Sequence, residues 1–371
     1  MTTGAFPRFG DASSDFVTPP SPDSPVPDAD VAGSGLEATQ EHEQCGTGLL
    51  VTAKDPLLDD AQVDALDKLC VPDELLEDWD SHEAKVMSPC AGNSSALPPV
   101  ARDIALRFVA HMAKLLNLHP NAWFHGAALL DVYCQRYNQA DMIVRLPATC
   151  IALVKMLKKV DTAELRMQNL SAHAGLFGEW LQSVGILTDF TTEEVLKEQE
   201  TSLLTTLEWK IFIPSIESWL SALCTRFNVL TQWLLIPSIT WVWETTISYA
   251  RILIMQNPAS ALLPPRKQAN GLLGLACVSA RLLPLDAIRP AKVCQLQWQQ
   301  LFLQIQVTVA QQAALPVCVM RDDHASRVLK LLCMSVGIDL ENLQQDAGDV
   351  ALQLGSPVNG NPVQTVSLAS V

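Results

Sequence analysis

The sequence lacks the short motifs that mark the common enzyme classes. Its 371 residues contain no GxGxxG or GxxxxGKS/T phosphate-binding loop, no GxSxG nucleophile motif and no HExxH metal motif. The seven histidines show no ligand-like spacing with the cysteines. We therefore expect a protein that is not an enzyme and that holds neither a metal nor a cofactor.

Paired cysteines, a long apolar run and a secretory signal are also missing. None of the ten cysteines is spaced CxxC, which favours buried thiols in a reducing compartment over a disulfide framework. The longest apolar run, 227–243, is interrupted by polar residues and is too short for a membrane helix. The start of the sequence has no basic region followed by an apolar one. We expect a soluble intracellular protein, in the nucleus, the cytoplasm or both.

A basic excess is absent as well. The net charge is −15, and residues 1–100 hold 19 acidic and four basic residues, so the other 271 residues carry 21 of each. A neutral core argues against a broad nucleic-acid surface. Residues 1–48 are rich in Pro, Ser, Asp, Gly and Thr, a composition typical of disorder. We expect a disordered acidic arm over 1–98, with a candidate amphipathic helix at 55–80.

Proline follows serine or threonine at five places in the expected arm and tail, the minimal context for proline-directed kinases. Phosphate at such a site adds a charge of about −1.5 to −2. Chance occurrence in segments rich in Pro and Ser remains the simpler explanation of the pattern. The candidate phosphorylation sites are Thr18, Ser21, Ser24, Ser88 and Ser356.

Beyond residue 98 the apolar residues recur at spacings of three and four, as on one face of a helix. Ile104, Phe108 and Met112 mark the first such face. Small residues between 268 and 283, among them Gly271 and Gly274, indicate closely packed helices. Helix start signals occur at Pro147, at Thr191 with Glu194 as a capping box, and at Ser215.

The pattern predicts an all-α fold without strands. We expect five helices in residues 99–214 and a second set, similar in order and length, in residues 215–345. The last helix of this second set is placed at 325–345, and residues 346–371 read as a polar tail. The chain is therefore expected to contain two helical domains in tandem.

Four charged residues interrupt the apolar helices of the first domain. Charges on apolar faces are costly unless they are paired or used for binding. For Lys155 and Glu200, a simpler interpretation is that their side chains reach water at the edge of the face. The four residues are Arg102, Asp131, Lys155 and Glu200.

The order and spacing of these charges resemble the cyclin box. ARDIALRF (101–108) is similar to the MRAIL-type first helix, and HGAALLDVYCQRY (125–137) to the second-helix segment ending Y-I-D-R-F. ATCIALVKMLKK (148–159) resembles the third-helix segment ending A-S-K-F-E-E. VLKEQETSLLTTLEWKIFIPS (195–215) resembles the fifth helix with its glutamate and aromatic residue. The resemblance covers about 99–215 and extends more loosely to about 325.

The resemblance implies two tandem five-helix cyclin-fold domains and a role as the activating subunit of a cyclin-dependent kinase. Arg102 and Asp131 would form an internal ion pair that fixes the box. Lys155 and Glu200 would bind backbone groups beside the kinase regulatory helix. The apolar contact in this heterodimer would come from Trp209 and Ile211.

Two departures and two alternatives qualify this interpretation. The E-E pair after the third-helix lysine is Leu157–Lys158 here. A TFIIB-like transcription factor shares the two-box fold, and a cyclin-fold scaffold would bind a partner without activating a kinase. The lysine and glutamate on helices three and five favour the kinase partner. The substrate-docking patch of cyclins is replaced by Ala101, Ala105, Phe108 and Ile143, so we expect no substrate recruitment there.

Overall fold

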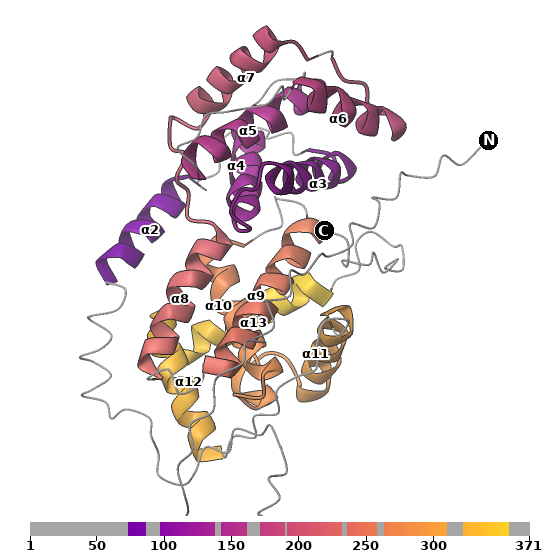
Figure 1. Ribbon diagram of the computed structural model, residues 1–371. Helices are drawn as coiled ribbons and strands as arrows, with labels where there is room; N and C mark the ends of the chain where they lie inside the picture. Colours follow the sequence, from indigo (N-terminus) through magenta and orange to yellow (C-terminus); the bar gives the residue numbers. More distant parts are fainter. Residues whose placement is uncertain are drawn as a thin grey trace, which may run out of the picture. The chain divides into compact units, whose positions relative to one another are not determined.

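The computed structural model describes eight stretches of the chain, all within one unit spanning residues 48–362. In these stretches every regular element is a helix and there is no strand, which confirms the all-α class (Figure 1). The five candidate phosphorylation sites and most of the predicted arm lie outside them. The described residues are 73–86, 97–137, 142–161, 171–189, 191–231, 236–257, 263–309 and 322–355.

A first group of five helices packs around its third member, α5. This helix contacts each of the other four. Its residues Ile151, Leu153 and Val154 are fully buried, as the apolar periodicity of the segment requires. The group consists of α3 (Pro99–Leu115), α4 (Ala122–Arg136), α5 (Leu146–Asp161), α6 (Ser171–Ser183) and α7 (Glu193–Thr206).

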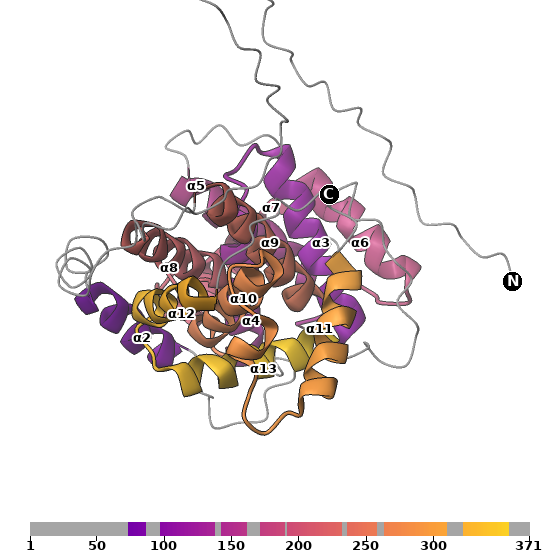
Figure 2. The same cartoon turned by 90° about the horizontal axis from the view of Figure 1, so that it is seen from below.

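A second group of helices packs around α10. This helix contacts α8, α9, α13 and the short helix η2 (Figure 2). Every residue from Gln268 to Ser279 is buried. The elements of the group are α8 (Ile216–Leu230), α9 (Ile236–Gln256), α10 (Pro265–Ser279), η2 (Leu285–Ile288), α11 (Gln295–Val309), α12 (Asp322–Val336) and α13 (Leu340–Gly355).

Glycine permits the close approach of α10 and α13. A Cβ atom at Gly271 would lie 2.5 Å from the main-chain oxygen of Asp346, too close for any real contact. The Asn270 amide donates to the Asp346 carboxylate at 3.0 Å beside this crossing. The small residues of this segment therefore serve helix packing, as their spacing predicts.

The C-terminal boundary of the second group corrects the sequence prediction. Residues 325–345 were expected to form one helix, but α12 ends at Val336 and a further helix, α13, runs to Gly355. Residues 346–355 of the predicted polar tail are therefore helical. The physical reason is an apolar stripe at helical spacing, buried at Leu343, Ala347, Val350, Ala351 and Leu354.

Helix start signals were predicted with mixed success. Pro147 lies in the first turn of α5, and Ser215 caps α8 in a capping box with Ser218. The cap of α7 is Thr192, one residue later than predicted, whose hydroxyl accepts from the Val195 amide at 3.3 Å. Two adjacent threonines offer the same capping oxygen, so sequence alone does not separate them.

The predicted disordered arm of residues 1–98 includes an ordered helix, α2 (Asp73–Val86), which overlaps the candidate helix at 55–80 only in part. The buried carboxylate of Glu83 accepts a hydrogen bond from the Trp219 indole of α8 at 2.7 Å. Trp79 packs edge-on against the same indole at 5.2 Å. An acidic helix can thus dock because its few apolar and hydrogen-bonding groups face the core.

Candidate functional site

Arg102 and Asp131 form the internal ion pair that the cyclin resemblance implies. The guanidinium of Arg102, in the first turns of α3, donates to both carboxylate oxygens of Asp131 on α4 at 2.8 Å. A third nitrogen donates to the carbonyls of Ile254 and Asn257 at the end of α9, at 2.6 and 2.9 Å. Carbonyls at a helix end lack partners within the helix, so Arg102 also ties the two helix groups together. No local pattern in the sequence indicates this second contact.

Lys155 and Glu200 come together on the adjacent helices α5 and α7. The Lys155 Nζ lies 3.4 Å from a Glu200 carboxylate oxygen, and each side chain is 16% exposed. Lys159, one turn further along α5, bonds the other oxygen of the same carboxylate. The two residues therefore pair with each other and do not simply extend to water.

The paired lysines keep Glu200 ionised. Partial burial alone raises the pKa of its carboxyl group. The hydrogen bonds and positive charges of Lys159 and Lys155 outweigh burial, and the pKa lies below its ordinary value. The site thus presents a carboxylate flanked by two ammonium groups.

Two large aromatic side chains stand exposed beside this charge cluster. Trp209 is 69% and Phe212 is 67% exposed, in the segment that follows α7. Between them Ile211 is half-buried against the core. Neighbouring apolar side chains that are left in water mark interaction surfaces more often than scattered single ones do.

The charges and the aromatics border one pocket of about 520 Å³. It lies between the last turns of α5, the middle of α7 and the segment after α7. Three of the four predicted binding residues line it. The fourth, Lys155, is not part of the lining but pairs with Glu200, which is. The lining residues are Met156, Lys159, Val160, Glu200, Leu204, Trp209, Ile211 and Phe212.

The backbone after α7 adopts an unusual conformation. The amides of Glu208 and Trp209 return to the carbonyls of Thr205 and Leu204 at 3.0 and 2.8 Å, which closes a Schellman motif. Glu208 and Trp209 both have positive φ, 53° and 61°, a region that glycine normally occupies. Strain of this kind persists only where the surroundings hold it, and it concentrates at binding sites.

The four residues expected to replace a substrate-docking patch are covered in this chain. Ala101, Ala105 and Phe108 are fully buried. The Phe108 ring stacks on Phe177 of α6 at 4.2 Å, and Ile143 is half-buried against the core. The buried face is therefore not available as an open patch.

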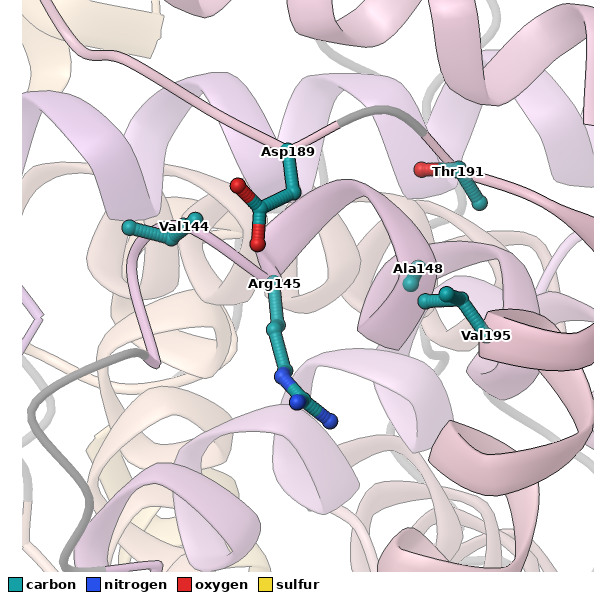
Figure 3. A pocket seen from close by; sticks show the side chains of 6 residues that line it. All are labelled: Val144, Arg145, Ala148, Asp189, Thr191 and Val195. Atoms are coloured by element: carbon teal, nitrogen blue, oxygen red, sulfur yellow. The ribbon is translucent and has the colours of Figure 1, made fainter.

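A second, smaller pocket of about 270 Å³ lies at the start of α5. Figure 3 shows its two charged residues, with the Arg145 guanidinium directed away from the Asp189 carboxylate. The Asp189 amide donates to the Val144 carbonyl at 3.2 Å, which joins the segment before α7 to the segment before α5. The lining contains no aromatic, histidine or cysteine side chain, and we assign it no chemistry.

The comparison with protein-family models finds no match for this chain, and the comparison with curated proteins finds no significant one. Within the stretches that the structure describes, no helix has the length and apolar character needed to cross a membrane. In the same stretches no three His, Cys, Asp or Glu residues gather as a metal site would require.

Proposed function

We propose that this chain is the regulatory subunit of a cyclin-dependent kinase and that it binds the kinase regulatory helix at the pocket between α5 and α7. One observation carries the proposal. Two charges that the cyclin resemblance singles out on separate segments, Lys155 and Glu200, are 3.4 Å apart beside the exposed Trp209. A charge pair at the rim of an apolar pocket is suited to bind the backbone of a partner helix.

The charge cluster supplies the polar part of the binding. Lys155 donates to a carbonyl of the partner, and Glu200 accepts from an amide. Charge-assisted hydrogen bonds of this kind are about twice as strong as neutral ones. Because the side chains are already ordered by their mutual bonds, little conformational entropy is lost on binding.

The aromatic side chains supply the apolar part. Trp209 and Phe212 are mostly exposed in the free chain, so a partner that covers them removes a large apolar area from water. Tryptophan and other buried aromatics dominate the affinity of many interfaces. We expect Trp209 to be the main anchor.

Binding at this place would change the kinase in a defined way. Phosphoryl transfer requires the glutamate of the kinase regulatory helix to pair with the lysine of its third strand. A subunit that binds the helix-in state more tightly shifts the equilibrium towards that state.

The test is a measurement of affinity and activation with purified monomeric cyclin-dependent kinases, using the full chain and its Lys155→Ala and Glu200→Ala variants. Lys155→Ala removes the donor to the partner while Glu200 keeps its bond to Lys159, and Glu200→Ala removes the acceptor and leaves both lysines without their carboxylate at the interface. We expect each variant to bind at least about 30-fold more weakly, roughly 2 kcal/mol. Peptide phosphorylation by the kinase should fall in parallel.

A matched control is the Asp103–Arg107 ion pair on α3, which joins its two charges at 2.9 Å on an exposed helix face. Arg107→Ala should leave affinity and activation unchanged. The proposal fails if the wild-type chain activates no kinase of the panel, or if all three variants behave alike. Binding without activation would support the scaffold alternative.

A further inference from the structure

One side chain outside the pocket connects α4 to the segment that carries the aromatics. His125 lies on α4, half-buried, and its Nε2 is 2.6 Å from the main-chain oxygen of Ile211. A carbonyl oxygen can only accept a hydrogen bond, so Nε2 carries the proton. The bond therefore runs from the imidazole to the backbone at Ile211, which lies between Trp209 and Phe212 in the sequence.

The surroundings favour the neutral imidazole. Burial lowers the pKa of His125, and its bond to Ile211 offsets this only in part, so the net pKa lies below its ordinary value. The ring also meets Phe212 edge-on, with 6.5 Å between the two ring centroids. His125 thus contacts the segment twice, once at the backbone and once at an exposed aromatic.

The segment that His125 holds is the strained one. Two successive non-glycine residues with positive φ, Glu208 and Trp209, turn the chain away from α7. Further on, the amides of Lys210 and Ile211 donate to Leu207 and Trp209 at 2.9 and 3.1 Å, which makes a tight, local loop. A loop of this kind keeps one conformation only where contacts from the body fix it.

We propose that His125 is a positioning residue of the partner-binding site, holding residues 208–212 in the conformation that presents Trp209 and Phe212 to the pocket. The consequence for kinase affinity rests on the proposed function. The effect on the loop is a property of the free chain and is measured without a partner.

The experiment compares three variants of the full chain by hydrogen exchange of the peptide covering 207–213. His125→Ala removes both contacts, and His125→Phe keeps an aromatic ring without the donor. His125→Gln places an amide N–H near the position of Nε2. We expect the Lys210 and Ile211 amides to exchange about tenfold faster in the Ala and Phe variants, and close to the wild-type rate in the Gln variant.

Kinase affinity should follow the same order, about three- to tenfold weaker for His125→Ala and His125→Phe and restored in His125→Gln. His111→Ala is the matched control, because His111 is a partly buried histidine of α3 that packs near Trp180 and away from the loop. It should leave exchange in 207–213 unchanged.

The possible results separate the two proposals. Unchanged exchange in His125→Ala, a uniform rise along the whole chain, or no rescue by His125→Gln overturns the positioning role, whatever the kinase does. A local rise with rescue, in a wild-type chain that binds no kinase, supports the positioning role and refutes the proposed function.

Discussion

The two central helices, α5 and α10, hold similar places in their groups but differ in how far they are enclosed. In α10 every residue from Gln268 to Ser279 is buried, and its two charges, Arg266 and Lys267, lie in the first turn. In α5 the apolar residues from Leu146 to Leu157 are equally buried, yet Lys155, Lys158 and Lys159 interrupt its last turns and Val160 is exposed. Those turns border the pocket, whereas α13 packs along α10.

The difference assigns separate tasks to the two groups. The extra helix α13 completes the burial of α10, and the buried part of α10 carries no charged residue. The first group has no counterpart of α13 among the described residues, and the turns of α5 that would need cover carry lysines and face the exposed Trp209 and Phe212. We infer that the second group is a packed support and that the first presents the binding surface.

We expect the largest effect on stability where α10 packs most closely against α13. Gly271→Ala places a Cβ atom 2.5 Å from the main-chain oxygen of Asp346, and backbone cannot move aside as a flexible side chain can. The two helices must separate, which we expect to lower the free energy of unfolding by about 3 kcal/mol. Chemical denaturation followed by circular dichroism measures this.

The same substitution at Gly175 on α6 is the matched control, since no atom beyond the surrounding turn of its own helix lies within 4 Å of the added Cβ. There alanine should raise stability by up to about 1 kcal/mol through its higher helix propensity. Equal effects at the two glycines would contradict the close α10–α13 crossing.

Much of the first group is readable from the sequence, because helical spacing and buried charges are local patterns. Lys155 and Glu200 stand out as charges on apolar helices, and the cyclin resemblance adds Trp209; Glu200 and Trp209 line one pocket, and Lys155 pairs with Glu200. Lys159 was missed although it lies four residues from Lys155, the spacing that puts two side chains on one helix face. The spacing by itself places Lys159 in the same charge cluster.

The remaining contacts depend on tertiary structure and leave no local signal. His125 meets Ile211 only because α4 packs beside the end of α7. Arg102 meets the carbonyls of α9 across the two groups. Helix α13 did leave a signal, its apolar stripe, but intervening Gln, Asp and Gly residues led to the prediction of a polar tail.

A second prediction concerns the docking of α2 on the second group. Burial raises the pKa of Glu83 from 4.5 to about 7, against the bonds from Trp219 and the Arg266 amide, which lower it. The folded chain therefore binds a proton between these two values where the unfolded chain does not. Stability from this group is present at low pH and is lost as the pH rises through about 7.

Glu83→Gln isolates this effect, because glutamine can accept from the Trp219 indole but does not titrate. From about pH 5 to pH 8 the wild type should lose up to about 2 kcal/mol relative to the variant. Urea denaturation of both chains at several pH values measures the difference. Parallel pH profiles would show that Glu83 is not protonated in the folded chain.

The smallest effect compares the helix ends of the two groups. Both α7 and α10 end in a Schellman motif with a non-glycine residue at positive φ, Glu208 at 53° and Arg281 at 58°. Glycine at either place relieves the same backbone strain, so Glu208→Gly and Arg281→Gly should each raise the melting temperature by about 2 °C relative to the alanine variant at that position. Alanine removes the side chain but keeps the Cβ, so the difference in melting temperature reports the backbone alone.

In the α7 loop, however, Trp209 stays strained at φ 61°, and Glu208→Gly frees the segment that His125 holds. Kinase affinity should therefore fall with Glu208→Gly and stay constant with Arg281→Gly. If both glycine variants leave affinity unchanged, the conformation of the loop does not matter for binding. The difference between a first group that exposes a binding surface and a fully packed second group would then depend on the charges of α5 alone.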